Sequence, residues 1–194
     1  MLSWIYLMHR SVPPGALNVS VWISPNCLCQ NISISLMSKL PEYRLVQSVH
    51  IFFCGGSVDG SKSDCGLFIL DYVFPTQYTD TQVCKRLPGH LSSTRAELYS
   101  ILEVLHIATT SLKDVLLFVD SQAALRSHLS PGTHTPTDCD IVNKCLSVIG
   151  STEKSGARIH FTWVPSQVSI PFNEKTDNLA QLALQDETVD PAWH

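Results

Sequence analysis

Residues 115–125 read VLLFVDSQAAL: an unbroken apolar run leads to Asp120 and passes directly into a helical pattern. An apolar run without alternation is typical of a strand that is covered on both faces. Binding and catalytic groups of α/β proteins lie at the carboxyl ends of such strands. Asp120 is therefore a candidate site residue, although it could also cap the helix predicted from Ser121.

The segments on either side of this run predict the rest of the fold. Upstream, three β-rich runs joined by short polar links indicate an antiparallel meander. Downstream, strand and helix patterns alternate, which predicts an α/β layered fold with a mixed sheet. The expected strands are 49–54, 65–72, 81–87, 115–119 and 158–164, with a polar turn at 59–64, and the expected helices are 94–108, 121–129, 140–149 and 173–184.

Two further acidic residues lie in predicted helices. Glu97 lies in STRAEL at 93–98, and Asp177 lies in the last helix. Each has a structural alternative, because Glu97 follows Thr94 by three residues as in a capping box, and Asp177 could be a first-turn acid favoured by the helix dipole. With Asp120, however, they are three carboxylates from separate elements. Clustered carboxylates repel one another and suit Mg²⁺, and two such ions about 3.5–4 Å apart hydrolyse phosphodiesters.

The composition limits the class of protein. The 194 residues are 44% hydrophobic and 15% charged, which predicts a packed domain. The net charge of −4 provides no basic field that would favour nucleic acid. Seven cysteines without a CxxC pair argue against a zinc site and predict reduced thiols in an intracellular protein, with the compartment left open. The sequence shows no signal peptide or membrane span, so no membrane partner is expected.

The N-terminal quarter differs from the rest of the chain. Residues 1–45 have no sustained helical or strand period and are interrupted by several prolines. We predict an irregular leader over 1–45, a folded domain over 46–186 and a flexible tail over 187–194. The folded domain is expected to be monomeric.

Four motifs in this order resemble those of the ribonuclease H family, and most closely the domains carried by non-LTR retrotransposons. The resemblance implies a three-layer α/β fold whose five-stranded mixed sheet is flanked by helices. It also implies endonucleolytic cleavage of the RNA strand of RNA/DNA hybrids with Mg²⁺, Mn²⁺ being a possible substitute. The motifs are HIFFCGGS at 50–57, SSTRAEL at 92–98, FVDSQAAL at 118–125 and FTWVPSQVSIPFNEKTDNLA at 161–180.

The resemblance also implies roles for individual residues. Glu97, Asp120 and Asp177 match the second, third and fourth metal-binding acids of the family. Thr94 matches a position near the minor groove of the hybrid, where 2′-hydroxyl groups distinguish RNA from DNA. Thr94 as a helix cap is an equally good interpretation.

The first motif departs from the family pattern. The family carries Thr-Asp-Gly-Ser, whereas this sequence has CGGS at 54–57, so the acid that contacts both metals in the family is Gly55 here. The run DGSK at 59–62 offers a rival alignment in which Asp59 is the first catalytic acid. That register would put the glycines inside a central strand, where glycine is disfavoured. In the preferred Gly55 register, Asp59 lies about 13 Å further along an extended strand.

Gln167 is a second departure from the family pattern. Many members carry histidine at this position, on a mobile loop that assists turnover. Glutamine forms hydrogen bonds but cannot shuttle a proton near neutral pH. This change predicts a slower enzyme rather than an inactive one.

Three functions stay open from the sequence. The first is a working hybrid-cutting nuclease in which Asp59 or a relaxed geometry completes the site. The second is a catalytically inactive, retroelement-derived domain that binds nucleic acid or a partner. The third is another nuclease or integrase of the same superfold, against which the NEKTD context of Asp177 argues.

Overall fold

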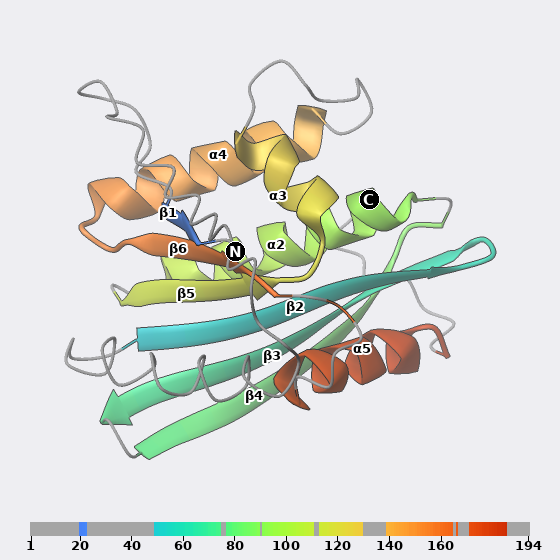
Figure 1. The fold of residues 1–194 in the computed structure, drawn as a ribbon, viewed down its shortest axis with the longest axis horizontal. Helices are drawn as coiled ribbons and strands as arrows, with labels where there is room; N and C mark the ends of the chain where they lie inside the picture. The colour runs from blue at the N-terminus through green and yellow to red at the C-terminus, as the bar shows by residue number, and fades with distance from the viewer. Residues whose placement is uncertain are drawn as a thin grey trace, which may run out of the picture.

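The computed structural model describes residues 20–22, 49–74, 77–89, 91–110, 113–129, 139–164, 166 and 171–185. Within these ranges, six strands form one mixed sheet in the order β1-β6-β5-β2-β3-β4, with helices on both faces (Figure 1). The strands are β1 (Ser20–Trp22), β2 (Val49–Asp59), β3 (Lys62–Phe74), β4 (Gln77–Leu87), β5 (Asp114–Val119) and β6 (Ile159–Trp163), and the helices are α2 (Ser93–Thr109), α3 (Gln122–Leu129), α4 (Cys139–Lys154) and α5 (Pro171–Ala183).

The strand pairing confirms the expected combination of a meander with parallel strands. β3 lies antiparallel between β2 and β4, and β5 lies parallel between β2 and β6. Parallel neighbours require crossover connections, which contain α2 before β5 and then α3 and α4 before β6. The carboxyl ends of β5 and β6 therefore meet at one edge of the sheet, where Asp120 follows β5.

The sheet has six strands rather than the five expected from the sequence. The additional strand is β1, which pairs parallel with β6 along the edge of the sheet. It falls within segment 1–45, for which the sequence predicts no regular structure. Three residues are too few to produce a periodic pattern, and it is pairing with an edge strand that makes them extended. The remainder of that segment and the predicted tail at 187–194 lie outside the described residues.

The β2–β3 hairpin is longer than its sequence suggests. The polar stretch 59–64 was expected to be a turn, but only Gly60 and Ser61 separate the two strands. Gly60 adopts a φ of 60°, a left-handed conformation that glycine tolerates at no steric cost. Ser63 and Asp64 are fully buried within β3, so pairing with β2 and burial extend the strand beyond its apolar run.

The helices cover both faces of the sheet. α2, α3 and α4 lie on one face and α5 on the other (Figure 1). A Cβ at Gly56 would lie 2.5 Å from the Ala96 carbonyl carbon of α2, and a Cβ at Gly66 would collide with the Thr176 carbonyl oxygen of α5. These two glycines allow the helices to approach β2 and β3 closely. No described helix combines the length and the hydropathy needed to cross a membrane.

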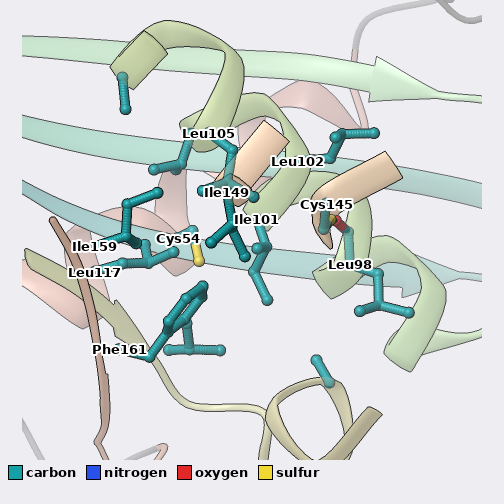
Figure 2. Close-up of a cluster of buried hydrophobic side chains, with 14 of the residues drawn as sticks. Cys54, Leu98, Ile101, Leu102, Leu105, Leu117, Cys145, Ile149, Ile159 and Phe161 are labelled. Atoms are coloured by element: carbon teal, nitrogen blue, oxygen red, sulfur yellow. The ribbon is translucent and has the colours of Figure 1, made fainter. Parts of the chain in front are cut away.

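The main core fills the layer between the sheet and α2 and α4. Figure 2 shows Leu98, Ile101 and Leu105 of α2 in one cluster with Leu117 of β5 and Phe161 of β6. All five side chains are at most 1% exposed. Burial of each large apolar side chain contributes about 1.5–3 kcal/mol, so this layer stabilises the fold and holds α2 on the sheet.

Candidate active site

Asp120 directly follows β5 and is oriented by two neighbouring side chains. The Asn173 Nδ2 group of α5 donates to Asp120 Oδ2 at 3.4 Å, and Trp163 Nε1 donates to the Asp120 backbone oxygen at 3.0 Å. Ser121, rather than Asp120, caps the following helix, because Ser121 Oγ accepts from the Ala124 N–H at 3.2 Å. The Asp120 carboxylate is therefore not engaged as a helix cap.

Glu97 lies in the first turns of α2 and faces β2. Its Oε1 accepts a hydrogen bond from the Gly56 N–H at 2.9 Å, and its side chain is only 7% exposed. The N-cap of α2 is Ser92, whose hydroxyl accepts from the Arg95 N–H, so Glu97 does not belong to a capping box with Thr94. Glu97 Oε2 is buried and has no hydrogen-bond partner among the described residues.

Asp177 lies at the middle of α5 rather than in its first turn, where the acid is Glu174. The dipole interpretation therefore applies to Glu174 and not to Asp177. Burial raises the pKa of Asp177 to about 6, and the negative charges of Asp120 and Glu174 add to the effect. The helix dipole therefore does not explain why the half-buried carboxylate of Asp177 lies inside α5.

The three acids affect one another electrostatically. Burial raises the pKa of Glu97 well above its usual range, and the charges of Asp120 and Asp177 raise it further against the Gly56 N–H hydrogen bond. Burial also raises the pKa of Asp120, while the Asn173 amide lowers it. Helix α2, the end of β5 and helix α5 thus bring one carboxylate each to a shared region.

Gly55 faces this shared region from β2. A Cβ built on Gly55 would lie 3.1 Å from Asp177 Oδ1 and 3.4 Å from Thr176 Cγ2, both of them side-chain atoms. By contrast, the Cβ positions at Gly56 and Gly66 are blocked by helix backbone. Packing therefore demands glycine at 56 and 66 but not at 55, where a side chain would point towards the Asp177 carboxylate.

Asp59 lies elsewhere. It is exposed, pairs with Lys62 at the end of the hairpin and stands four residues beyond Gly55 in β2. Thr94 is partly exposed in the first turn of α2. Gln167 lies outside the described residues. The structure thus brings Glu97, Asp120 and Asp177 together around Gly55 and leaves Asp59 at the hairpin end.

Two supporting residues were not singled out from the sequence. Asn173 is 2% exposed and precedes Asp177 by one helical turn, so both side chains lie on one face of α5. Ser100 Oγ donates to the Gly55 carbonyl oxygen at 2.9 Å and ties α2 to β2. The i, i+4 spacing from Asp177 could have identified Asn173, whereas Ser100 carries no distinguishing pattern.

The acids as placed do not form a complete metal site. Among the described residues, no three histidine, cysteine, aspartate or glutamate side chains lie close enough to hold a metal ion together. The buried, unpartnered Glu97 Oε2 and the mutual rise in pKa are what a cation would relieve. The residues present therefore attract a cation but do not fit a two-ion centre with a shared carboxylate.

Comparisons with known proteins identify the family. The sequence model of the RNase H family matches residues 47–185. Among solved structures, the N-terminal RNase H domain of a Mycobacterium tuberculosis protein, fused to maltose-binding protein, is 15% identical with a TM-score of 0.54 over 70% of this chain and 93% of that one. LC9-RNase H1, a type 1 RNase H with the type 2 active-site motif, is 13% identical with a TM-score of 0.59 over 73% of this chain and 74% of that one. No curated protein sequence matches. Because the family match covers well over half of the sequence, this chain belongs to the ribonuclease H family.

Proposed function

We propose that this chain is a ribonuclease H-type domain for RNA/DNA hybrids whose metal-dependent cleavage of the RNA strand is impaired, because glycine stands at position 55. The observation that supports the proposal is that a Cβ at position 55 would lie 3.1 Å from Asp177 Oδ1. Glu97 and Asp120 reach the same region from α2 and β5. The second, third and fourth acids of the family site are thus represented by Glu97, Asp120 and Asp177, and the first position, Gly55, lacks a carboxylate.

Of the four acids of the family site, the one replaced by Gly55 is expected to have the largest effect on the cleavage rate. When bound, divalent ions supply an activated water and stabilise the leaving oxygen of a phosphodiester. Glu97, Asp120 and Asp177 would be the residues that attract such ions, and glycine supplies no side-chain oxygen to bridge them. A bridging ligand worth several kcal/mol to the transition state corresponds to roughly a thousandfold in rate.

Three finer points of the proposal rest on the family motifs. The ions are Mg²⁺, with Mn²⁺ as a substitute, and the domain acts as a monomer. Thr94, partly exposed in the first turn of α2, contacts the minor groove of the hybrid. The relationship to non-LTR retrotransposon domains rests on the four motifs and is part of the same proposal.

The test is to restore the carboxylate. Gly55→Asp and Gly55→Asn have nearly the same size, so the pair isolates the effect of the charge. We expect Gly55→Asp to cleave a labelled RNA/DNA hybrid in Mg²⁺ or Mn²⁺ roughly a thousandfold faster than the native chain, and Gly55→Asn to stay near the native rate. If a folded Gly55→Asp variant is no faster than Gly55→Asn, the proposed role of position 55 is wrong.

Asp59 requires its own control. If the native chain cleaves and Asp59→Ala abolishes cleavage, the rival register is correct and Gly55 is not the first-acid position. We expect Asp59→Ala to leave any residual cleavage unchanged, because Asp59 is exposed at the hairpin end.

A second function is favoured by the absence of a three-ligand metal group among the described residues. In this alternative the domain binds nucleic acid or a partner without cleaving. Gel-shift affinities of the native chain for an RNA/DNA hybrid and for DNA duplex of the same sequence test it independently of cleavage. Tighter binding to the hybrid, with no cleavage by the native chain or by Gly55→Asp, would favour the alternative.

A further inference from the structure

Strand β4 forms one edge of the sheet, and no described strand pairs with its outer side (Figure 1). It has 11 residues and contains no proline. Along it, Tyr78–Gln82 and Cys84 are exposed. Every second residue of an edge strand directs its N–H and C=O groups away from the sheet. Native proteins usually shield such an edge with prolines, bulges, short strands or charges, because a strand of another chain can pair with it.

The two large apolar side chains that are exposed among the described residues both border this edge. Tyr78, in β4 itself, is 51% exposed, and Leu182, in α5, is 54% exposed. Lys175, Leu179 and Leu182 follow helical spacing along one side of α5. The ion pair between Lys175 and Asp80 turns that side towards β4. Exposed apolar side chains that gather in one place are typical of a contact with another protein chain.

From these observations we infer that β4 pairs antiparallel with β4 of a second copy of this chain, about a two-fold axis at Val83. An axis perpendicular to the sheet joins the two sheets into one and keeps each side chain on its own face. In this register Asp80 of each copy faces Arg86 of the second copy, so two opposite-charge pairs form across the contact. Moving the axis by one residue in either direction would set Asp80 opposite Cys84 or Pro88 instead. Charge therefore selects both the partner and the register.

The same pairing brings the exposed apolar side chains of the two copies together. Tyr78 lies at the start of β4. Leu182 lies near the end of β4, because Lys62, which begins β3 beside that end, donates from its Nζ to the Leu184 oxygen at 3.4 Å. In an antiparallel pair the start of one strand lies beside the end of the other. Tyr78 of one copy is therefore set near Leu182 of the second copy, and both lose exposed apolar surface.

The pairing leaves the candidate active site within each copy. The closest approaches of α5 to the sheet, at Gly55 and Gly66, are to β2 and β3, so a strand added beside β4 does not displace this helix. Glu97, Asp120 and Asp177 come from α2, the end of β5 and α5, and none of them lies in β4. Each copy keeps its own acids, so the unit that acts in the proposed function is still a single domain.

The first experiment measures the mass of the whole native chain by sedimentation equilibrium over a range of micromolar concentrations. We expect a reversible dimer. Asp80→Lys sets like charges opposite each other at two places in the contact, which should weaken dimerisation roughly tenfold or more. Asp59→Lys makes the same change of charge at the exposed hairpin end, away from the β4 edge, and should leave the dimer unchanged.

The second experiment tests the register with cysteine pairs. In the inferred dimer, position 82 faces Cys84 of the second copy, at a spacing that a disulfide can bridge. Gln82→Cys should therefore form a disulfide-linked dimer under mild oxidation, seen on a non-reducing gel. Thr81→Cys, the matched control on the next residue, faces Lys85 and should give no more linked dimer than the native chain.

Each outcome decides the inference. A native chain that stays monomeric over the whole concentration range overturns it. A dimer that Asp80→Lys does not weaken, or equal cross-linking of Gln82→Cys and Thr81→Cys, would show that the copies meet at another surface and would also overturn it. Neither measurement involves a metal ion or cleavage, so its result leaves the proposed function untouched. Circular dichroism establishes that each variant is folded.

Discussion

Glu97 carries two separable properties at the level of a single residue. Its Oε1 satisfies the Gly56 N–H and so fixes α2 to β2, whereas burial, together with the charge of Asp120, disfavours the ionised carboxylate and raises the pKa of Glu97. The first property stabilises the fold, and the second costs stability in the absence of a cation. Substitutions that remove one property at a time can separate them.

Glu97→Gln and Glu97→Ala form such a pair. Glutamine retains an acceptor for the Gly56 N–H and removes the buried charge, so we expect it to be at least as stable as the native chain at neutral pH. Alanine leaves the Gly56 N–H unpaired, which should lower the free energy of unfolding by about 1–3 kcal/mol. Urea denaturation measures both values. Equal destabilisation by the two substitutions would contradict a structural role for this hydrogen bond.

At the level of elements, the contact between α2 and β2 depends on Gly56. A Cβ there would lie 2.5 Å from the Ala96 carbonyl carbon and 2.6 Å from the Glu97 nitrogen, so Gly56→Ala must push the helix away from the strand. We expect a loss of about 1–3 kcal/mol in the free energy of unfolding, the usual range for overpacking. Gly55→Ala is the matched control on the next residue, with an expected loss well below that of Gly56→Ala, because only side-chain atoms face it. Thermal or urea unfolding of the two variants tests the difference, and a reversed order would show that α2 is not held by this approach.

The elements that the sequence predicted well are those whose pattern and packing agree. The helix from Thr94 and the apolar run 115–119 were predicted because their apolar periodicity matches their burial. The β3 extension was missed because Ser63 and Asp64 have turn-like side chains yet are buried by pairing. β1 was missed because tertiary pairing alone defines it.

The candidate acids show a different limit of sequence reasoning. Each had a structural explanation when considered singly. Hydrogen bonds decide against it for Glu97 and Asp120, and the position of Asp177 in the middle of α5 decides against it there. Ser92, rather than Thr94, caps α2, and Ser121, rather than Asp120, caps α3. The i, i+4 spacing from Asp177 places Asn173 on the same face of α5, but its hydrogen bond to Asp120 depends on how α5 packs against the end of β5. Motif order therefore identified the candidate acids, and geometry was needed to decide between the alternative interpretations of each.

For the whole molecule, the acid region makes stability depend on pH. The pKa of Asp177 is raised to about 6 from its usual value of 3.8, so the folded state binds the proton more tightly than the unfolded chain does. The stability that this proton contributes is fully present below the unfolded pKa and is lost as pH rises through about 6. In the Asp177→Asn variant the side chain cannot titrate, so the free energy of unfolding does not fall in this way as the pH rises. Its free energy of unfolding relative to the native chain should therefore increase between pH 4 and 6.

Urea denaturation of both proteins at a series of pH values measures this difference, and Glu174→Gln serves as a control on the neighbouring acid of α5. Because the charge of Glu174 is a smaller cause of the shift than burial and Asp120, this variant should keep most of the native pH dependence. Added Mn²⁺ should reduce the difference between Asp177→Asn and the native chain above pH 6, since a cation offsets the same repulsion that the proton relieves. A difference that is constant with pH would show that Asp177 titrates at its ordinary pKa and that the three carboxylates do not share a region of the folded molecule.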